Sequence, residues 1–346
     1  MCEPESAEFV KLIELKLQKF LADKNYLGTG IICQLLYNFG NETPDLSMRQ
    51  SREYIAQTSM ESLRNCLRCE DHSKTRDYSI SVLYMLMKEN ALEDDQIDAS
   101  LLQDVCQCLK EDQSEWSLIF LTTLLETKPD VVALHYATFS LSHRSAIIDL
   151  CIENLFVLIG NSVLIEQFSN HFKQQSTQIL TTLKNTEIAL EPTEFTRLVT
   201  LFCELSAVDQ SQPNLADEKK LMIQNTTKQI QEDKSLLIDT VYLLRMIHEL
   251  GKSSDRNIFT PIRKISEEHP QESVENPVFG FKRDLIRLVG NMCWRHKENQ
   301  DEVCTHSICM PAKVFYGYND KKYTNLLSVV DSNPSFCQVY SSGSVV

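Results

Sequence analysis

The residues most able to do chemistry in this sequence are two cysteines and a histidine, Cys66-x-x-Cys69 followed by His72. Zinc needs three or four ligands that converge tetrahedrally, and no second Cys/His pair with suitable spacing lies nearby. A thioredoxin-like redox pair stands at the start of a helix after a strand, whereas residues 62–65 before this pair already look helical. We therefore interpret the pair as two cysteines of a helix beside a solvated histidine. A metal or thiol enzyme centred on these three residues is the alternative.

The other motifs with chemical potential are incomplete. His248-Glu249 resembles the start of a metalloprotease helix, but position 252 is Lys252 rather than the second histidine. Gly28-x-Gly30 lacks the third glycine and the preceding strand of a dinucleotide-binding loop, and the sequence has neither a Walker phosphate loop nor a Gly-x-Ser-x-Gly elbow. We predict no catalytic, cofactor-binding or metal-ligating residues, and we expect a protein that is not an enzyme.

Composition opposes several functional classes. The 346 residues include 34 Lys and Arg against 48 Asp and Glu, so the net charge is −14. Because binding to phosphates depends on Lys and Arg, this balance opposes nucleic-acid and anionic-membrane binding. The 9 glycines and 10 prolines are together about 5% of the chain, against an average near 12%, which disfavours sandwiches, propellers and glycine-rich nucleotide-binding folds.

The cellular compartment follows from the N-terminus and the cysteines. The first residues are acidic and lack the basic and apolar regions of a secretory signal. No stretch approaches the roughly 18 uninterrupted apolar residues of a membrane span. We expect an intracellular protein without membrane insertion, whose 12 cysteines are reduced. Cys33, Cys151 and Cys203 occupy apolar helical positions, where free cysteine packs as a small hydrophobic residue.

The pattern from residue 6 to about 296 is helical almost throughout. Two stripes of apolar residues at helical spacing are formed by Phe9, Ile13, Leu17 and Phe20 and by Leu237, Val241, Leu244 and Ile247. Gly251 is the expected end of the second helix. Strict alternation of apolar and polar residues never persists long enough to indicate a sheet.

The apolar segments recur at a regular interval. Their ends are placed near Gly40, Lys88, Thr127, Gly160, Val208, Gly251 and Arg295. The mean interval is about 42 residues, inside the ~40–47 residues of HEAT and armadillo units. We predict an all-α armadillo/HEAT-like α-solenoid, a right-handed superhelix of helical repeats, with residues 41–50 and 209–217 as loops between units. An irregular helical domain without repeats is the alternative.

One segment carries a specific resemblance. Residues 276–294 and their continuation to Val303 resemble the segment that opens the C-terminal domain of the ataxin-10 family. The positions that carry this family signature are Phe279, Gly280, Phe281, Lys282, Leu285, Ile286, Arg287, Leu288, Gly290, Asn291 and Cys293.

The same segment is expected to pack in the core. Leu285, Leu288, Val289 and Met292 stand at i, i+3, i+4 and i+7, which predicts a packing stripe. We expect Gly290 to permit a close helix approach, and a neighbouring turn to accept a hydrogen bond from Asn291. We therefore interpret the signature residues as structural rather than as a binding site.

The resemblance implies a non-enzymatic armadillo-repeat scaffold or adaptor without cofactors. It implies roles in neuronal survival, neurite outgrowth, cytokinesis and cilium-related processes. The implied partners are a heterotrimeric G-protein β subunit, O-GlcNAc transferase and mitotic kinases, together with homo-association through the C-terminal domain. The implied location is cytoplasmic and perinuclear, extending to the midbody, centrosome or base of the cilium. The alternative is an armadillo-type regulator or chaperone of heterotrimeric G-protein signalling.

The sequence departs from the family pattern after Val303, where unpatterned residues replace the expected further helices. We therefore predict three regions: an armadillo-like array over 1–275, the start of the C-terminal domain over 276–303, and a divergent, disordered tail over 304–346. The altered C-terminus weakens the expectation of homo-oligomers.

Overall fold

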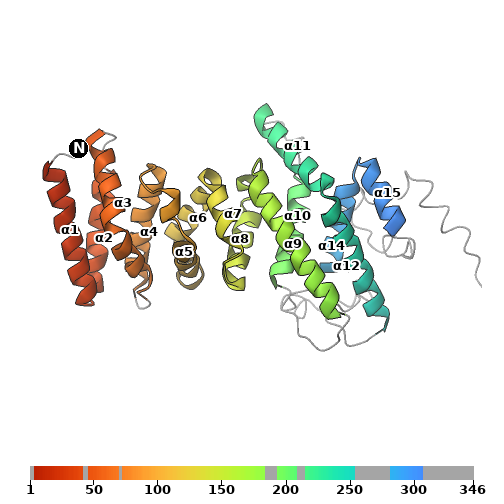
Figure 1. The fold of residues 1–346 in the computed structure, drawn as a ribbon, viewed down its shortest axis with the longest axis horizontal. Helices are drawn as coiled ribbons and strands as arrows, with labels where there is room; N and C mark the ends of the chain where they lie inside the picture. The colour runs from red at the N-terminus through yellow and green to blue at the C-terminus, as the bar shows by residue number, and fades with distance from the viewer. Residues whose placement is uncertain are drawn as a thin grey trace, which may run out of the picture. The chain divides into compact units, whose positions relative to one another are not determined.

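The chain is all-α, as predicted. The computed structural model describes residues 4–41, 46–69, 72–183, 193–208, 215–253 and 281–306, and every regular element in these ranges is helical (Figure 1). The contacts divide the chain into two compact units, Met1–Leu150 and Cys151–Val346, called here the N-terminal and C-terminal units. The predicted region boundaries at 275 and 303 both fall in the C-terminal unit and stay predictions.

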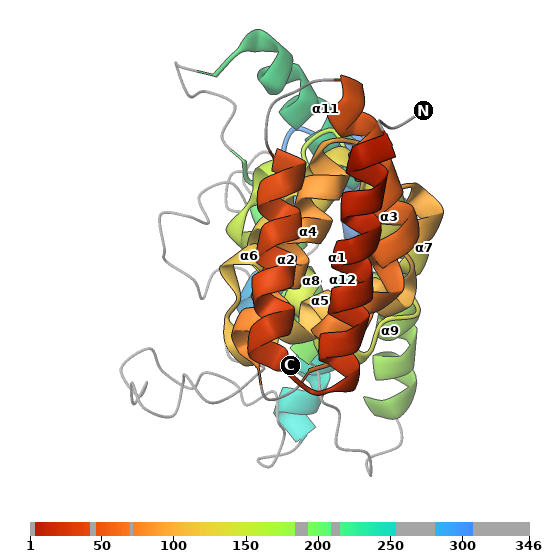
Figure 2. The same ribbon diagram turned by 90° about the vertical axis from the view of Figure 1, so that its left-hand side faces the viewer.

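The N-terminal unit is a stack of helix pairs in two layers. Its helices are α1 (Pro4–Ala22), α2 (Tyr26–Asn41), α3 (Leu46–Leu67), α4 (Ser73–Lys88), α5 (Ala99–Asp112), α6 (Glu115–Thr127), α7 (Pro129–Tyr136) and α8 (Leu141–Glu153), which continues across the boundary. Helix α2 packs against α4 and α4 against α6, while α1 packs against α3 and α3 against α5. Figure 2 shows α2, α4 and α6 on one side and α1, α3 and α7 on the other. This alternation is typical of helical-repeat stacks.

The C-terminal unit repeats the two-layer pattern with an additional helix. Its helices are α9 (Ser162–Leu183), α10 (Thr193–Ser206), α11 (Asp217–Glu232), α12 (Lys234–Ser253), α14 (Phe281–Cys293) and α15 (Lys297–His306). Helix α9 packs against α12, and α10 packs against α14, so α9–α10 and α12–α14 form successive pairs. Helix α11 is additional and contacts α10, α12 and α14.

The predicted repeat ends follow the ends of alternate helices. Those near Lys88 and Thr127 coincide with the last residues of α4 and α6. Four others lie within two residues of a helix end, namely those near Gly40, Val208, Gly251 and Arg295. The seventh, near Gly160, lies beyond a short 3-10 helix, Leu155–Val157, rather than at an α-helix end. Each of the first four intervals, from Gly40 to Val208, contains two successive α-helices.

Three details differ from the sequence predictions. Helix α12 continues through Gly251 to Ser253, so this glycine does not end it. Helix α3 already begins at Leu46, inside the stretch predicted as a loop. Helix α15 runs to His306, past the predicted boundary at Val303, and the remainder of the predicted tail lies outside the described residues.

Glycines let α2 pack closely on both neighbours. A Cβ atom on Gly28 would lie 2.7 Å from the Phe20 ring of α1, and one on Gly30 would lie 3.4 Å from both Thr75 and Tyr78 of α4. Any larger residue at Gly28 would displace the ring. The two glycines of the Gly28-x-Gly30 motif therefore allow α2 to pack closely on α1 and α4.

Polar side chains fix where the helices begin. Asp98 caps α5 by accepting a hydrogen bond from the Leu101 amide at 2.9 Å, and Ser114 caps α6 by accepting one from the Ser117 amide at 3.1 Å. The Asp98 carboxylate also accepts two hydrogen bonds from Arg64 Nη1 on α3, at 2.8 and 2.9 Å. One carboxylate thus starts α5 and attaches it to the preceding pair.

Candidate functional site

The segment that carries the family resemblance forms helix α14. Phe279 and Gly280 lie outside the described residues. The buried members of the helix are Phe281, Leu285, Ile286, Leu288, Val289, Gly290, Met292 and Cys293. All four residues of the predicted packing stripe are among them. Of the described signature residues, Lys282, Arg287 and Asn291 are half-buried.

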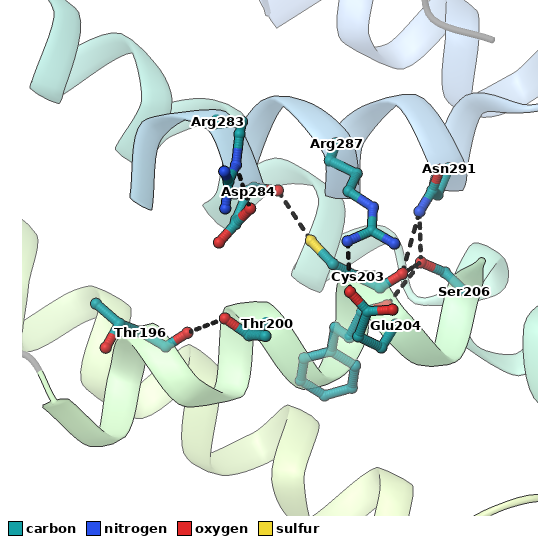
Figure 3. Close-up of polar contacts among 10 residues, drawn as sticks. Thr196, Thr200, Cys203, Glu204, Ser206, Arg283, Asp284, Arg287 and Asn291 are labelled. Atoms are coloured by element: carbon teal, nitrogen blue, oxygen red, sulfur yellow. Dashed lines mark hydrogen bonds and ion pairs between the residues drawn. The ribbon is translucent and has the colours of Figure 1, made fainter. Parts of the chain in front are cut away.

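Polar contacts join α14 to α10, as Figure 3 shows. Arg287 Nη1 on α14 lies 2.5 Å from Glu204 Oε1 on α10. Asn291 Nδ2 donates to the Cys203 carbonyl at 3.3 Å and to Ser206 Oγ at 3.1 Å, at the end of α10. The predicted hydrogen bond from Asn291 to a neighbouring turn is therefore present. In the other direction, Cys203 Sγ donates to the Asp284 carbonyl at 3.0 Å.

Burial at this interface perturbs the ionisable groups. Burial raises the pKa of the Asp284 carboxyl, although Arg283 and Arg287 oppose the shift. Burial opposes the charge of Arg287, but its hydrogen bond with Glu204 outweighs that cost and raises the pKa of the guanidinium. Burial also raises the pKa of the Cys203 thiol well above its usual value, which disfavours the thiolate.

The side-chain amides of Gln231 and Asn299 attach the C-terminal end of α14 to α11 and α15. Gln231 Nε2 donates to the carbonyls of Asn291 and Trp294, at 3.1 and 3.0 Å. Asn299 of α15 is fully buried, and its Nδ2 donates to the carbonyls of Gln231 and Met292, at 2.7 and 2.9 Å. These contacts attach α11, α14 and α15 to one another, so the resemblance-bearing helix contributes to packing.

The Cys66–Cys69–His72 cluster does not assemble a chemical site. Cys66 is buried, and its hydrogen bond with Cys33 together with burial raises its pKa. Cys69 Sγ donates to the Asn65 carbonyl at 3.4 Å, and burial raises its pKa as well. His72 is exposed and its ring packs on Tyr26, with centroids 4.4 Å apart. Neither thiol is poised to become a thiolate.

The described residues contain neither a metal-binding cluster nor a membrane-spanning helix. Within the described residues, no three or more His, Cys, Asp or Glu side chains form a group that could hold a metal ion. No helix in this part of the chain is long and apolar enough to cross a membrane. The side chains of His248 and Glu249 lie outside the described residues.

A cavity of about 440 Å³ in the C-terminal unit is lined by residues of α9, α10, α11 and α12. Lys173 Nζ in its wall lies 2.9 Å from Asp233 Oδ2, and Ser169 Oγ donates to the same oxygen. The other oxygen of Asp233 accepts from the Leu236 amide at 3.0 Å and so caps α12. Burial opposes the Asp233 charge, but these hydrogen bonds outweigh it and lower the pKa of the carboxyl. Lys173 and Asp233 in this wall are therefore already paired with each other.

The N-terminal unit exposes apolar side chains on α2. This helix contains no charged residue, and Leu27, Ile31 and Leu35 are 77%, 58% and 41% exposed. We call these three residues the α2 face. This face was not predicted from the sequence, although its signal is present there as an i, i+4, i+8 apolar stripe in a helix without charged residues. Exposed contiguous apolar surface is typical of protein interaction sites.

Comparison with known proteins gives one consistent similarity. The chain is 27% identical to ataxin-10 of Bos taurus over 254 residues, covering 69% of this chain and 48% of the relative. Ataxin-10 of Homo sapiens is 25% identical over 251 residues, and that of Xenopus tropicalis is 27% identical over 251 residues. The chain spans about half the length of these curated relatives. No family model matches the chain, and no solved structure gives a significant match.

Proposed function

Because the chain is an ataxin-10-like helical-repeat protein, we propose that it is a non-enzymatic scaffold that binds protein partners through its N-terminal unit. The observation that carries this proposal is the α2 face, which exposes three large aliphatic side chains on a helix without charges. A binding partner that covered them would remove apolar surface from water, the dominant favourable term in most protein association.

The resemblance supports a choice of partners. We propose a heterotrimeric G-protein β subunit, O-GlcNAc transferase and mitotic kinases as candidates. The corresponding roles are neuronal survival, neurite outgrowth, cytokinesis and cilium-related processes. The corresponding locations are the cytoplasm and perinuclear region, with the midbody, centrosome or base of the cilium as further sites.

Direct binding of purified candidates tests the proposal. The immobilised full chain is probed by surface plasmon resonance with each candidate protein, alongside a Leu27→Glu/Ile31→Glu variant. Leu134→Glu is the matched control, because Leu134 on α7 is 74% exposed and so nearly as accessible as Leu27. We expect at least one candidate to bind the parent and the control, and to lose roughly tenfold or more in affinity for the α2-face variant.

Two results would contradict the proposal. The scaffold function fails if none of the purified candidates binds the parent chain. The assignment to the α2 face fails if the double variant and the Leu134→Glu control bind a candidate equally well.

A further inference from the structure

Three aromatic rings from three successive helices of one layer meet in the N-terminal unit. They are Tyr37 of α2, Tyr84 of α4 and Trp116 of α6, helices that Figure 2 shows on the same side. The Trp116 ring lies edge-on to Tyr37 with centroids 5.4 Å apart, and it lies 5.8 Å from the Tyr84 ring at a tilt of 48°. We call these residues the aromatic cluster. All three are half-buried, so part of each ring remains accessible to solvent.

The polar ends of these rings make no hydrogen bond with the residues that the structure describes. Among the described residues, the indole N–H of Trp116 and the hydroxyls of Tyr37 and Tyr84 have no hydrogen-bond partner. Buried tryptophan and tyrosine usually place these groups against a protein acceptor. Here three hydrogen-bond donors accompany three flat apolar surfaces and are left for water or a ligand.

The charges around the cluster do not select a charged ligand. Helix α2 contributes none. On α4, Lys88 Nζ lies 5.9 Å from the centre of the Tyr84 ring, and the Asp77 carboxylate already accepts a hydrogen bond from Ser114. A ligand suited to this surface therefore supplies hydrogen-bond acceptors and apolar groups that can pack on the aromatic rings, without needing formal charge.

A polyproline II segment has that chemistry. Its backbone has no internal hydrogen bonds, so its carbonyls are free to accept, and its proline rings are compact and apolar. Aromatic-lined sites exploit this preformed helix because little conformational entropy is lost on binding. Ile119 extends the surface along α6, three residues from Trp116 on the same helical face and 40% exposed. We propose that the aromatic cluster docks a proline-rich segment of a partner protein; this proposal rests on the scaffold function.

Tryptophan fluorescence offers a direct test, since Trp116 and Trp294 are the chain's 2 tryptophans. In the full chain carrying Trp294→Phe, the signal comes from Trp116 alone. The probe is a polyproline peptide of about ten residues, with a Gly-Ser peptide of equal length as the comparison ligand. We expect saturable binding of polyproline and none of Gly-Ser.

Conservative variants separate docking from packing. Tyr37→Phe and Tyr84→Phe keep the rings and remove only the hydroxyls, and each should weaken binding roughly 3- to 10-fold. Tyr54→Phe on α3 is the matched control, because it removes another half-buried tyrosine hydroxyl from the opposite layer and should leave affinity unchanged.

Three outcomes would overturn the proposal. These are no polyproline binding, equal binding of the Gly-Ser peptide, or equal affinity in both hydroxyl variants and the control. If polyproline fails while a purified partner protein still binds through the α2 face, only the aromatic-cluster proposal is lost. If neither binds, the scaffold function is lost with it.

Discussion

A buried ion pair joins three helices of the N-terminal unit and permits a quantitative prediction. Arg76 of α4 donates from Nε to Asp112 Oδ2 at 2.7 Å and from Nη2 to Oδ1 at 2.5 Å, at the end of α5. Its Nη1 donates to the Cys69 carbonyl, just after α3, at 3.1 Å. The Arg76 and Asp112 side chains are only 6% and 12% exposed. The bidentate hydrogen bond with Asp112 is the main reason that the pKa of Arg76 is raised.

Arg76→Met should destabilise the unit because it leaves the Asp112 carboxylate without its partner. Breaking a fully buried pair costs about 3–5 kcal/mol. Asp112 retains some access to water and can relax towards it, so we expect about 3 kcal/mol. With a urea dependence of about 2 kcal/mol per molar for a unit of this size, the unfolding midpoint should fall by roughly 1.5 M.

The measurement is urea unfolding followed by Trp116 fluorescence in the Trp294→Phe background, which reports on the N-terminal unit. A double-mutant cycle with Asp112→Leu isolates the pair itself. Replacing both partners by apolar groups is often nearly neutral, so the Arg76→Met/Asp112→Leu variant should recover most of the lost stability. The reasoning is refuted if Arg76→Met costs less than about 0.5 kcal/mol, or if the double variant loses the sum of the two single losses.

Three further predictions concern the α14 region of the C-terminal unit. Leu288→Asp places an unpaired carboxylate at a fully buried position and should cost several kcal/mol; a melting temperature equal to the parent's would show that α14 is not packed. Asp284→Asn should stabilise the protein near pH 7, because the pKa of the Asp284 carboxyl is raised in the folded state and its ionised form therefore destabilises the fold. The gain should vanish in thermal melts below about pH 4, where the carboxyl becomes protonated in the folded and unfolded states alike. Asn299→Leu leaves the Gln231 and Met292 carbonyls without their donor and should cost about 2–3 kcal/mol in chemical unfolding, and a loss under about 0.5 kcal/mol would contradict this account.

The helices and their buried faces were predictable because hydrophobic periodicity reports burial directly. Leu285, Leu288, Val289 and Met292 fall on one face at 3.6 residues per turn, and all four are buried. Periodicity is less informative where apolar residues are adjacent. The spacing places Phe9 on the apolar stripe of α1, but its side chain is 39% exposed and its neighbour Val10 is fully buried instead.

Helix ends were harder to predict because several helices of this chain end without the glycine that usually follows a helix C-terminus. The turns after α1, α4, α5 and α14 contain Lys24, Asn90, Gln113 and Arg295 with φ of 52°, 54°, 50° and 53°. This left-handed conformation is commonly occupied by glycine at helix C-termini, and lysine, glutamine or arginine there gives no signal in the sequence. Gly251, which does match the signal, lies inside α12.

The aromatic cluster had no local signal either. Tyr37, Tyr84 and Trp116 come from three different helix pairs, and only the stacking of α2, α4 and α6 brings them together.

The pKa of the Cys66 thiol likewise depends on tertiary packing. Its partner, Cys33, is on another helix, and their hydrogen bond raises the pKa of Cys66. Contacts of this kind, between residues far apart in the sequence, can be predicted only when it is known which helices pack together.

In a stack of helix pairs, each pair covers the face of the one before it, and partners meet only the surface that stacking leaves open. Residues 281–303 of the segment that resembles the ataxin-10 family form α14 and part of α15, and the apolar side chains of α14 are covered by neighbouring helices. The α2 face and the aromatic cluster lie on helices far away in the sequence. The residues that carry the family resemblance are therefore not those that we expect to select partners. It follows that exchanging the exposed residues of α2, α4 and α6 between two relatives should exchange their partners, whereas exchanging α14 should change stability alone.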